Sequence, residues 1–132
     1  MNGYAIVLAS EELEKIQAAS MIGSVAAVSD VPVELFVTMN ALNAFEKETV
    51  ENGSFVVGQV GEYMMSGESG EMSLFTDQLA QGKEIGPLSV YACSMAMDVQ
   101  GKHLDDYVDV FDEELGIAGF LQHAADKNVI FI

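Results

Sequence analysis

Apolar positions along this chain fall into two recurring patterns. Near-continuous apolar runs are typical of strands that are covered on both faces. These runs lie at residues 4–9, 33–38, 88–93, 107–111 and 129–132. Between the runs, apolar and small residues recur at three- and four-residue spacing, which predicts helices. The helices are expected at residues 11–29, 42–51, 72–81, 94–100 and 115–127.

Strands that alternate with helices predict a doubly wound parallel sheet. The first strand, the long helix from residue 11 to 29 and the second strand make one βαβ unit with a right-handed crossover. A length of 132 residues fits one domain with a sizeable core. We therefore expect a single three-layer α/β domain, residues 1–132, with about five mainly parallel strands.

The segment from residue 53 to residue 70 interrupts this alternation. It contains five glycines, at positions 53, 58, 61, 67 and 70, and two short apolar patches. We interpret it as a mobile excursion that covers the site or joins a subunit contact.

Charge narrows the possible functions. The formal net charge is −16, with five lysines and no arginine, so a nucleic-acid partner and any guanidinium clamp on phosphate are not expected. The acidity fits a solvated surface or a high-salt cytoplasm. The sequence contains no stretch of eighteen or more apolar residues, so no membrane-spanning helix is expected. No basic segment of a secretory signal is visible before the first strand. A single cysteine favours a reducing cytoplasm.

That cysteine, Cys93, is the main candidate for chemistry. It stands at the carboxyl end of the strand at residues 88–93, the edge at which open α/β sheets collect ligands. Backbone N–H groups of residues 94–97 would stabilise its thiolate if a helix begins there. Packing of Cys93 as a small apolar side chain is the competing interpretation.

Other residues follow or end the predicted strands and are expected to line the same crevice. The possible lining residues are Ser10, Glu11, Asn40, Asn43, Ser94, Met95 and Met97. Caps and turns explain several of them equally well. The sequence has no dinucleotide or phosphate-loop motif and no zinc-like cysteine and histidine spacing, so we expect no cofactor and no metal. A Cu(I) site at Cys93, Met95 and Met97 is less favoured than simple packing.

Three blocks of sequence resemble the DsrE/DsrF-like family of small sulfur-metabolism proteins. The closest likeness is to the soluble branch that is often labelled a peroxiredoxin family. The first block is residues 5–13, with the small-residue helix that follows, and the second is residues 33–43. The third is residues 91–99, supported by residues 118–121 and the final strand.

The resemblance implies a flavodoxin-like sheet and a homo-oligomer, commonly a trimer or hexamer. It also implies a cysteine that carries sulfane sulfur as a persulfide between donor and acceptor proteins, and only Cys93 matches that position. The second cysteine of some relatives has no counterpart here. The thiol peroxidase label does not suit the chain, because no threonine precedes Cys93 at the required spacing and arginine is absent.

The favoured interpretation is a cytoplasmic sulfur carrier. Such a carrier passes sulfur between proteins rather than turning over a small substrate, so whether it is an enzyme stays open. Two alternatives stay open. One is a non-catalytic ligand-binding or assembly module in which Cys93 packs, and the other is a thiol redox sensor. An accessible thiol that opens into a crevice would distinguish the first interpretation from the second.

Overall fold

The computed structural model describes residues 2–68 and 73–132. Its five strands form one sheet in the order β4-β3-β2-β1-β5, and every neighbouring pair is parallel. The expected α/β class is therefore confirmed. The strands are β1 (Tyr4–Leu8), β2 (Val33–Val37), β3 (Leu88–Cys93), β4 (Glu113–Leu115) and β5 (Asn128–Phe131).

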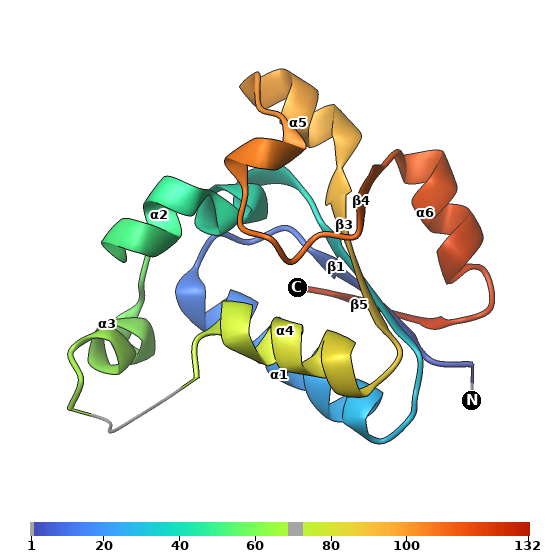
Figure 1. Ribbon diagram of the computed structural model, residues 1–132, viewed down its shortest axis with the longest axis horizontal. Coiled ribbons are helices and arrows are strands. Elements are labelled where there is room, and N and C mark those ends of the chain that lie inside the picture. Colours follow the sequence, from blue (N-terminus) through green and yellow to red (C-terminus); the bar gives the residue numbers. More distant parts are fainter. Residues whose placement is uncertain (1, 69–72) are drawn as a thin grey trace.

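Helices connect these strands and cover both faces of the sheet (Figure 1). The α-helices are α1 (Leu13–Val28), α2 (Lys47–Asn52), α3 (Gln59–Met65), α4 (Phe75–Ile85), α5 (Ser94–Gln100) and α6 (Ile117–Ala124). Two short 3₁₀ helices complete the described chain, η1 (Met39–Phe45) and η2 (Leu104–Asp106). The fold is a three-layer, flavodoxin-like arrangement.

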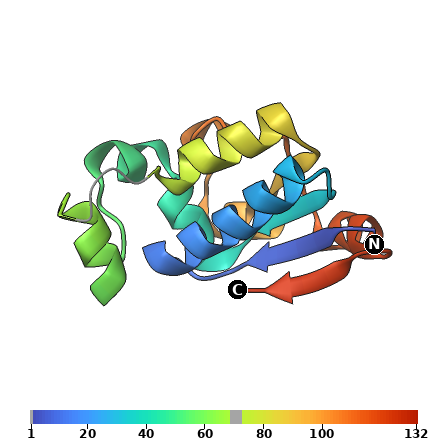
Figure 2. The ribbon, with the colours of Figure 1, turned by 90° about the horizontal axis from the view of Figure 1, so that it is seen from below.

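One face of the sheet is covered by α1 and α4, which lie side by side (Figure 2). Small residues allow their close approach. A methyl group added at Gly82 of α4 would lie 3.0 Å from Cβ of Ser24 and 2.9 Å from the Leu88 side chain. Small residues of α1 also face the sheet: Gly23 and Ala27 are buried, and a methyl group added at Gly23 would lie 3.6 Å from the Val33 side chain of β2.

The opposite face is covered mainly by α6. The Phe36 ring of β2 stacks on the Phe120 ring of α6, with centroids 4.4 Å apart. Residues paired in a parallel register point to the same side, so Ser89, Tyr91 and Cys93 of β3 share this face with Phe36. Cys93 is thus on the α6 side of the sheet.

The strand expected at residues 107–111 is wrong. Tyr107 and Phe111 make an edge-on aromatic contact, and Phe111 also packs against Phe45 of η1. These residues form a buried turn, because their side chains enter the core beyond the sheet edge. The fourth strand starts later and pairs only three residues with β3, from Glu113 to Leu115.

The glycine-rich segment contains a helix that its sequence did not predict, α3. The Glu14 carboxylate of α1 accepts the Gly58 N–H at 2.9 Å and thereby holds the start of α3 against α1. Backbone hydrogen bonds from Gly58 and Gly61 lower the pKa of Glu14. Gly70 of this segment lies outside the described residues, as does the expected helix start at residue 72.

Other predicted helices also have different bounds. The helix expected at residues 72–81 continues through Gly82 and ends at Ile85. The helix expected at residues 42–51 is split into η1 and α2, and α2 is followed by Gly53 with a left-handed φ of 65°. The last helix is shorter than expected and occupies residues 117–124.

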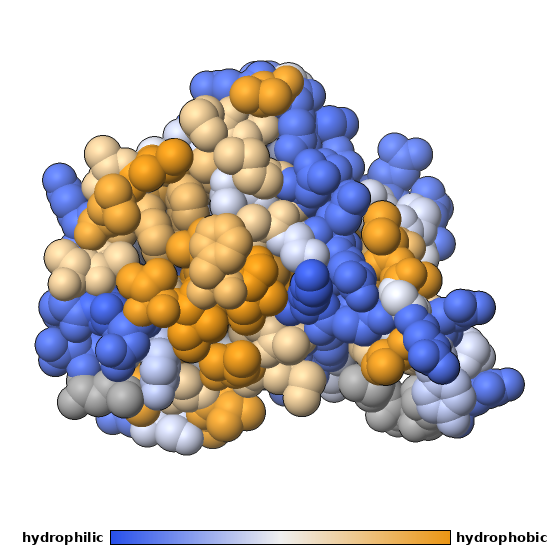
Figure 3. All heavy atoms as spheres, turned by 180° about the vertical axis from the view of Figure 1, so that it is seen from behind, coloured by the Kyte–Doolittle hydropathy of each residue, from blue (hydrophilic) through white to orange (hydrophobic). Residues whose placement is uncertain are grey.

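Among the described residues, no helix has both the length and the apolar character needed to cross a membrane. Apolar side chains nevertheless reach the surface. Figure 3 shows a continuous apolar area on the side of the molecule where β5 and α6 lie, with hydrophilic side chains beside it.

Candidate functional site

Cys93 occupies the position that the sequence predicts. It is the last residue of β3, and α5 begins at the next residue, Ser94. Cys93 has extended backbone angles of φ −68° and ψ 115°, which let the chain turn directly from strand into helix. The register places it beside Leu115 of the edge strand β4.

The thiol itself is not presented to solvent. Cys93 is 0% exposed and belongs to the apolar core. Leu115 contributes to its cover, since the Leu115 side chain extends from β4 to α6. A methyl group at Gly119 of α6 would lie 2.9 Å from that side chain. The expected opening of Cys93 into a crevice is therefore not found in this conformation.

Two of the expected lining residues do come together. Asn43 Nδ2 donates to Glu11 Oε2 at 3.5 Å, and both residues line a hollow of about 70 Å³. Thr49, Ser54 and residues from the following turn complete the hollow, and Cys93 is not among its lining residues. This hollow has room for a few water molecules at most.

The remaining lining candidates have separate roles. Ser10 does not cap α1, which starts at Leu13, and its hydroxyl accepts the Glu12 N–H at 3.3 Å. Asn40 is exposed on η1. The η1 helix is tied to α5 because Gln100 Nε2 donates to the Met39 carbonyl at 3.2 Å.

The three candidates that follow Cys93 differ in burial. Met97 lies in the core, Met95 is exposed and Ser94 is half-buried. Met95 and Met97 therefore do not share one environment with the thiol, as a soft-metal site would require.

The structure brings together a polar cluster that sequence reasoning missed. Glu34 of β2 is its centre, with Oε1 2.6 Å from His123 Nδ1 and 3.2 Å from the donating Tyr91 hydroxyl. Lys127 Nζ lies 3.6 Å from Glu34 Oε2. Burial raises the pKa of Tyr91, with the nearby Glu34 carboxylate acting in the same direction. The hydrogen bond to Asp126 and the charge of Glu34 raise the pKa of Lys127.

A sequence signal for this cluster existed. Glu34 is the only charged residue in the apolar run at residues 33–38. His123 and Lys127 are four residues apart, near the end of the helix predicted at residues 115–127. Glu34, Ser89 and Lys127 also line a hollow of about 240 Å³ at the amino-terminal ends of β2 and β3. The charged groups on the α6 face thus lie at the end of β3 opposite to Cys93.

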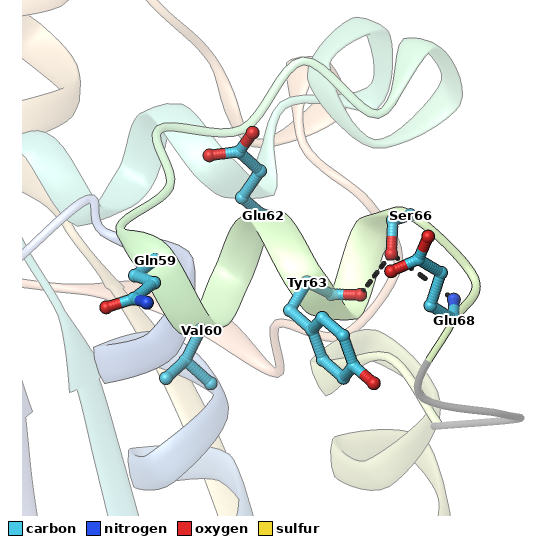
Figure 4. A pocket seen from close by; sticks show the side chains of 6 residues that line it. All are labelled: Gln59, Val60, Glu62, Tyr63, Ser66 and Glu68. Carbon is cyan, nitrogen blue, oxygen red and sulfur yellow. Dashed lines mark hydrogen bonds between the residues drawn. The ribbon is translucent and has the colours of Figure 1, made fainter.

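A larger hollow, of about 680 Å³, lies on the outer surface of α3 and the turn after it. Figure 4 shows its lining side chains, in which Tyr63 and Val60 project from one side of the helix. Its polar contacts are local, since the Ser66 hydroxyl donates to the Tyr63 carbonyl at 2.7 Å. The hollow is separate from the carboxyl edge of the sheet.

A comparison of the sequence with known protein families and with curated proteins finds no match. Solved structures are similar over the whole chain. The YchN protein from E. coli aligns with a TM-score of 0.65 at 16% identity, covering 100% of both chains. MTH1491 from Methanobacterium thermoautotrophicum, a protein of unknown function, aligns with a TM-score of 0.56 at 16% identity, covering 98% of this chain and 99% of that one. At this identity the likeness shows a shared fold.

Proposed function

We propose that this protein is a sulfur carrier of a reducing cytoplasm that holds sulfane sulfur as a persulfide on Cys93. The observation that carries the proposal is the position of Cys93 at the end of β3, directly before α5. The sequence resemblance to the DsrE/DsrF-like family supports the same role. Its partners would be donor and acceptor proteins, and the carrier itself would be a homo-oligomer.

The transfer balances without any further reactant. The Cys93 thiolate attacks the outer sulfur of a donor persulfide, so a new S–S bond forms at Cys93 while the donor S–S bond breaks and the donor leaves as a thiolate. An acceptor thiolate then attacks the outer sulfur of the Cys93 persulfide and releases the Cys93 thiolate. The chain undergoes no net redox change in a complete cycle.

Burial of Cys93 places a condition on this proposal, since a thiol that is 0% exposed cannot meet a donor. The element best suited to open is β4. It is an edge strand of three residues in which Glu113 and Glu114 are exposed and only Leu115 packs inward. Short edge elements with few buried contacts open at low free-energy cost. Displacement of β4 would remove Leu115 from its place beside Cys93.

The same burial favours a second candidate function, an assembly or ligand-binding module in which Cys93 packs the core. Free cysteine is among the most buried residue types and behaves as a small apolar side chain. In that case no opening of β4 is needed, and replacing Cys93 by alanine or valine affects stability alone.

One experiment separates the two functions. The folded protein is incubated with a low-molecular-weight persulfide and analysed by intact-mass spectrometry, with Cys93→Ser as the control. The carrier proposal expects a one-sulfur adduct on the native chain and none on Cys93→Ser. An unmodified native chain, under conditions in which an exposed thiol reacts fully, would establish the packing function instead.

A further inference from the structure

The long helix α1 is apolar on two sides. One stripe, which includes Leu13, Ile16 and Gly23, is buried against the sheet. A second apolar stripe faces outward at helical spacing, at Met21, Ile22, Val25 and Val28. Val25 is 66% exposed. A helix that is apolar all round is normally buried on every side, so the outer stripe lacks a partner in the single chain.

The edge strand β5 has the same property. Val129 and Phe131 are 59% and 74% exposed. The N–H groups of Asn128 and Ile132 donate inward to the carbonyls of Gly3 and Val7. Because successive residues of a strand alternate, the N–H and C=O groups of Val129 and Phe131 point to the open edge. In a monomer, an open strand edge with apolar side chains leaves backbone hydrogen-bonding groups unpaired and apolar surface in contact with water.

These two elements border a shallow, open apolar hollow of about 550 Å³. Its lining includes Met21 and Val25 from α1, Tyr4 from β1 and Ile130 from β5, and no charged side chain contributes to it. On the other face of the sheet, Ile117 and Leu121 of α6 are also exposed. The apolar area in Figure 3 extends over the same elements.

We call this area the β5 face, and it is defined by its large exposed side chains. They are Met21, Ile22, Val25, Val28, Ile117, Leu121, Val129 and Phe131. The largest apolar patch of an ordinary monomer measures about 300–600 Å². Eight large side chains that are each 41% to 74% exposed reach the upper part of that range or exceed it. A standard interface needs about 800 Å² from each partner.

The charge of the chain indicates what covers the β5 face. With a net charge of −16, two copies repel each other wherever their carboxylates meet. Neither the eight side chains that define the β5 face nor the described residues that line its hollow include an Asp or a Glu, so two acidic chains can approach there. A basic partner would gain most on the acidic surface instead. An open strand edge is also self-complementary, because a two-fold axis sets identical N–H and C=O groups opposite each other.

We propose that the β5 face binds a second copy of this chain, with the two β5 edges adjacent across a two-fold axis. This interface gives a location to the homo-oligomer of the proposed function. It does not involve Cys93, so the interface and the sulfur carrier can fail independently.

The test is sedimentation of the full chain at several protein and salt concentrations. The native chain is expected to self-associate, and more strongly at high salt, because salt screens the repulsion between acidic copies. Phe131→Lys and Val25→Lys, one on each element, are each expected to weaken self-association by about 30-fold or more, the effect of removing an interface hot spot. Val99→Lys is the matched control, since Val99 is 82% exposed on α5, away from the β5 face.

A monomeric native chain at high salt would overturn the proposal. It would also be overturned if Val99→Lys weakened association while Phe131→Lys and Val25→Lys did not. Circular dichroism of each variant confirms folding, and Cys93→Ser is expected to associate like the native chain. An associating chain that takes up no sulfur leaves the interface standing and rejects only the carrier function.

Discussion

The two ends of β3 present opposite environments on the same face of the sheet. At the carboxyl end, Cys93 is enclosed by apolar side chains. Toward the amino-terminal end, on the same face, the Tyr91 hydroxyl donates to Glu34, which also contacts His123 and Lys127 in a connected polar cluster. The thiol therefore belongs to the apolar core, whereas the hollow beside Glu34 and Lys127 does not include Cys93 in its lining. The comparison shows that a position at a strand end does not by itself expose a thiol to solvent.

The largest effect is expected from removing the Phe36–Phe120 stack, on the face of the sheet that carries both regions. Phe120 is buried and packs α6 against β2. Phe120→Ala is expected to cost about 3–5 kcal/mol of unfolding free energy, because a buried cavity replaces the ring. Denaturant unfolding at neutral pH measures this loss. Gln122→Ala, an exposed change in the same helix and outside the β5 face, is the control and is expected to cost little.

The polar cluster is expected to stabilise the fold through Glu34, whose side chain is 12% exposed. Glu34→Ala leaves the Tyr91 hydroxyl and His123 Nδ1 without this carboxylate partner, and is expected to cost about 2–3 kcal/mol. Glu34→Gln, which keeps hydrogen-bonding atoms in place, is expected to cost less. Glu113→Ala removes the same charge from an exposed position and corrects for the relief of net charge. If Glu34→Ala and Glu113→Ala had the same unfolding free energy, the polar cluster would contribute nothing to the stability of the fold.

The sequence predicted the fold well for a clear reason. Apolar runs and helical spacing report burial, and burial is what sets the strands at residues 4–8, 33–37 and 88–93. Prediction failed at residues 107–111, because an apolar run that packs as a buried turn has the same composition as a strand. It also missed α3, whose start is held by a long-range bond between Glu14 and Gly58.

The site was predicted in part. The position of Cys93 before a helix follows from local sequence, since an apolar run behind Pro87 is followed by a segment that predicts a helix. The burial of Cys93 does not follow from local sequence, because β4, which pairs with this end of β3, comes about 20 positions later in the chain. The Glu34 cluster joins three segments that are far apart in sequence, so only the tertiary fold brings it together.

Opening of the Cys93 region can be measured without any assumption about sulfur. Leu115→Ala removes the side chain beside the thiol and is expected to speed alkylation of Cys93 in the folded protein by about tenfold. This change corresponds to about 1.4 kcal/mol in the opening equilibrium. Ile85→Ala, at an exposed position on α4, is the control. If the alkylation rate follows only the global unfolding free energy of each variant, β4 does not act as a separate opening unit.

The smallest expected effect comes from a matched pair of buried tyrosines that differ only in their hydroxyl partners. The Tyr91 hydroxyl donates to Glu34, whereas the Tyr107 hydroxyl is buried without a partner among the described residues. Tyr91→Phe is expected to lose about 1 kcal/mol, and Tyr107→Phe to gain a similar amount at neutral pH. Urea unfolding measures the change in unfolding free energy of each variant. If both variants were less stable than the native chain, the Tyr107 hydroxyl would have a hydrogen-bond partner in the folded protein.

The pH dependence of the Tyr107 variant tests the same environment independently. Burial raises the pKa of Tyr107 to about 12 from an ordinary value of 10.0. Below pH 10 the hydroxyl is neutral in both states, so its contribution to stability is fully present. As pH rises from 10 toward 12, the unfolded chain loses this proton first, and the native protein loses stability relative to Tyr107→Phe. The difference between the two unfolding free energies should therefore widen over that window, because the lysines titrate equally in both proteins. A constant difference from pH 9 to pH 12 would show that Tyr107 ionises as freely in the folded protein as in the unfolded chain.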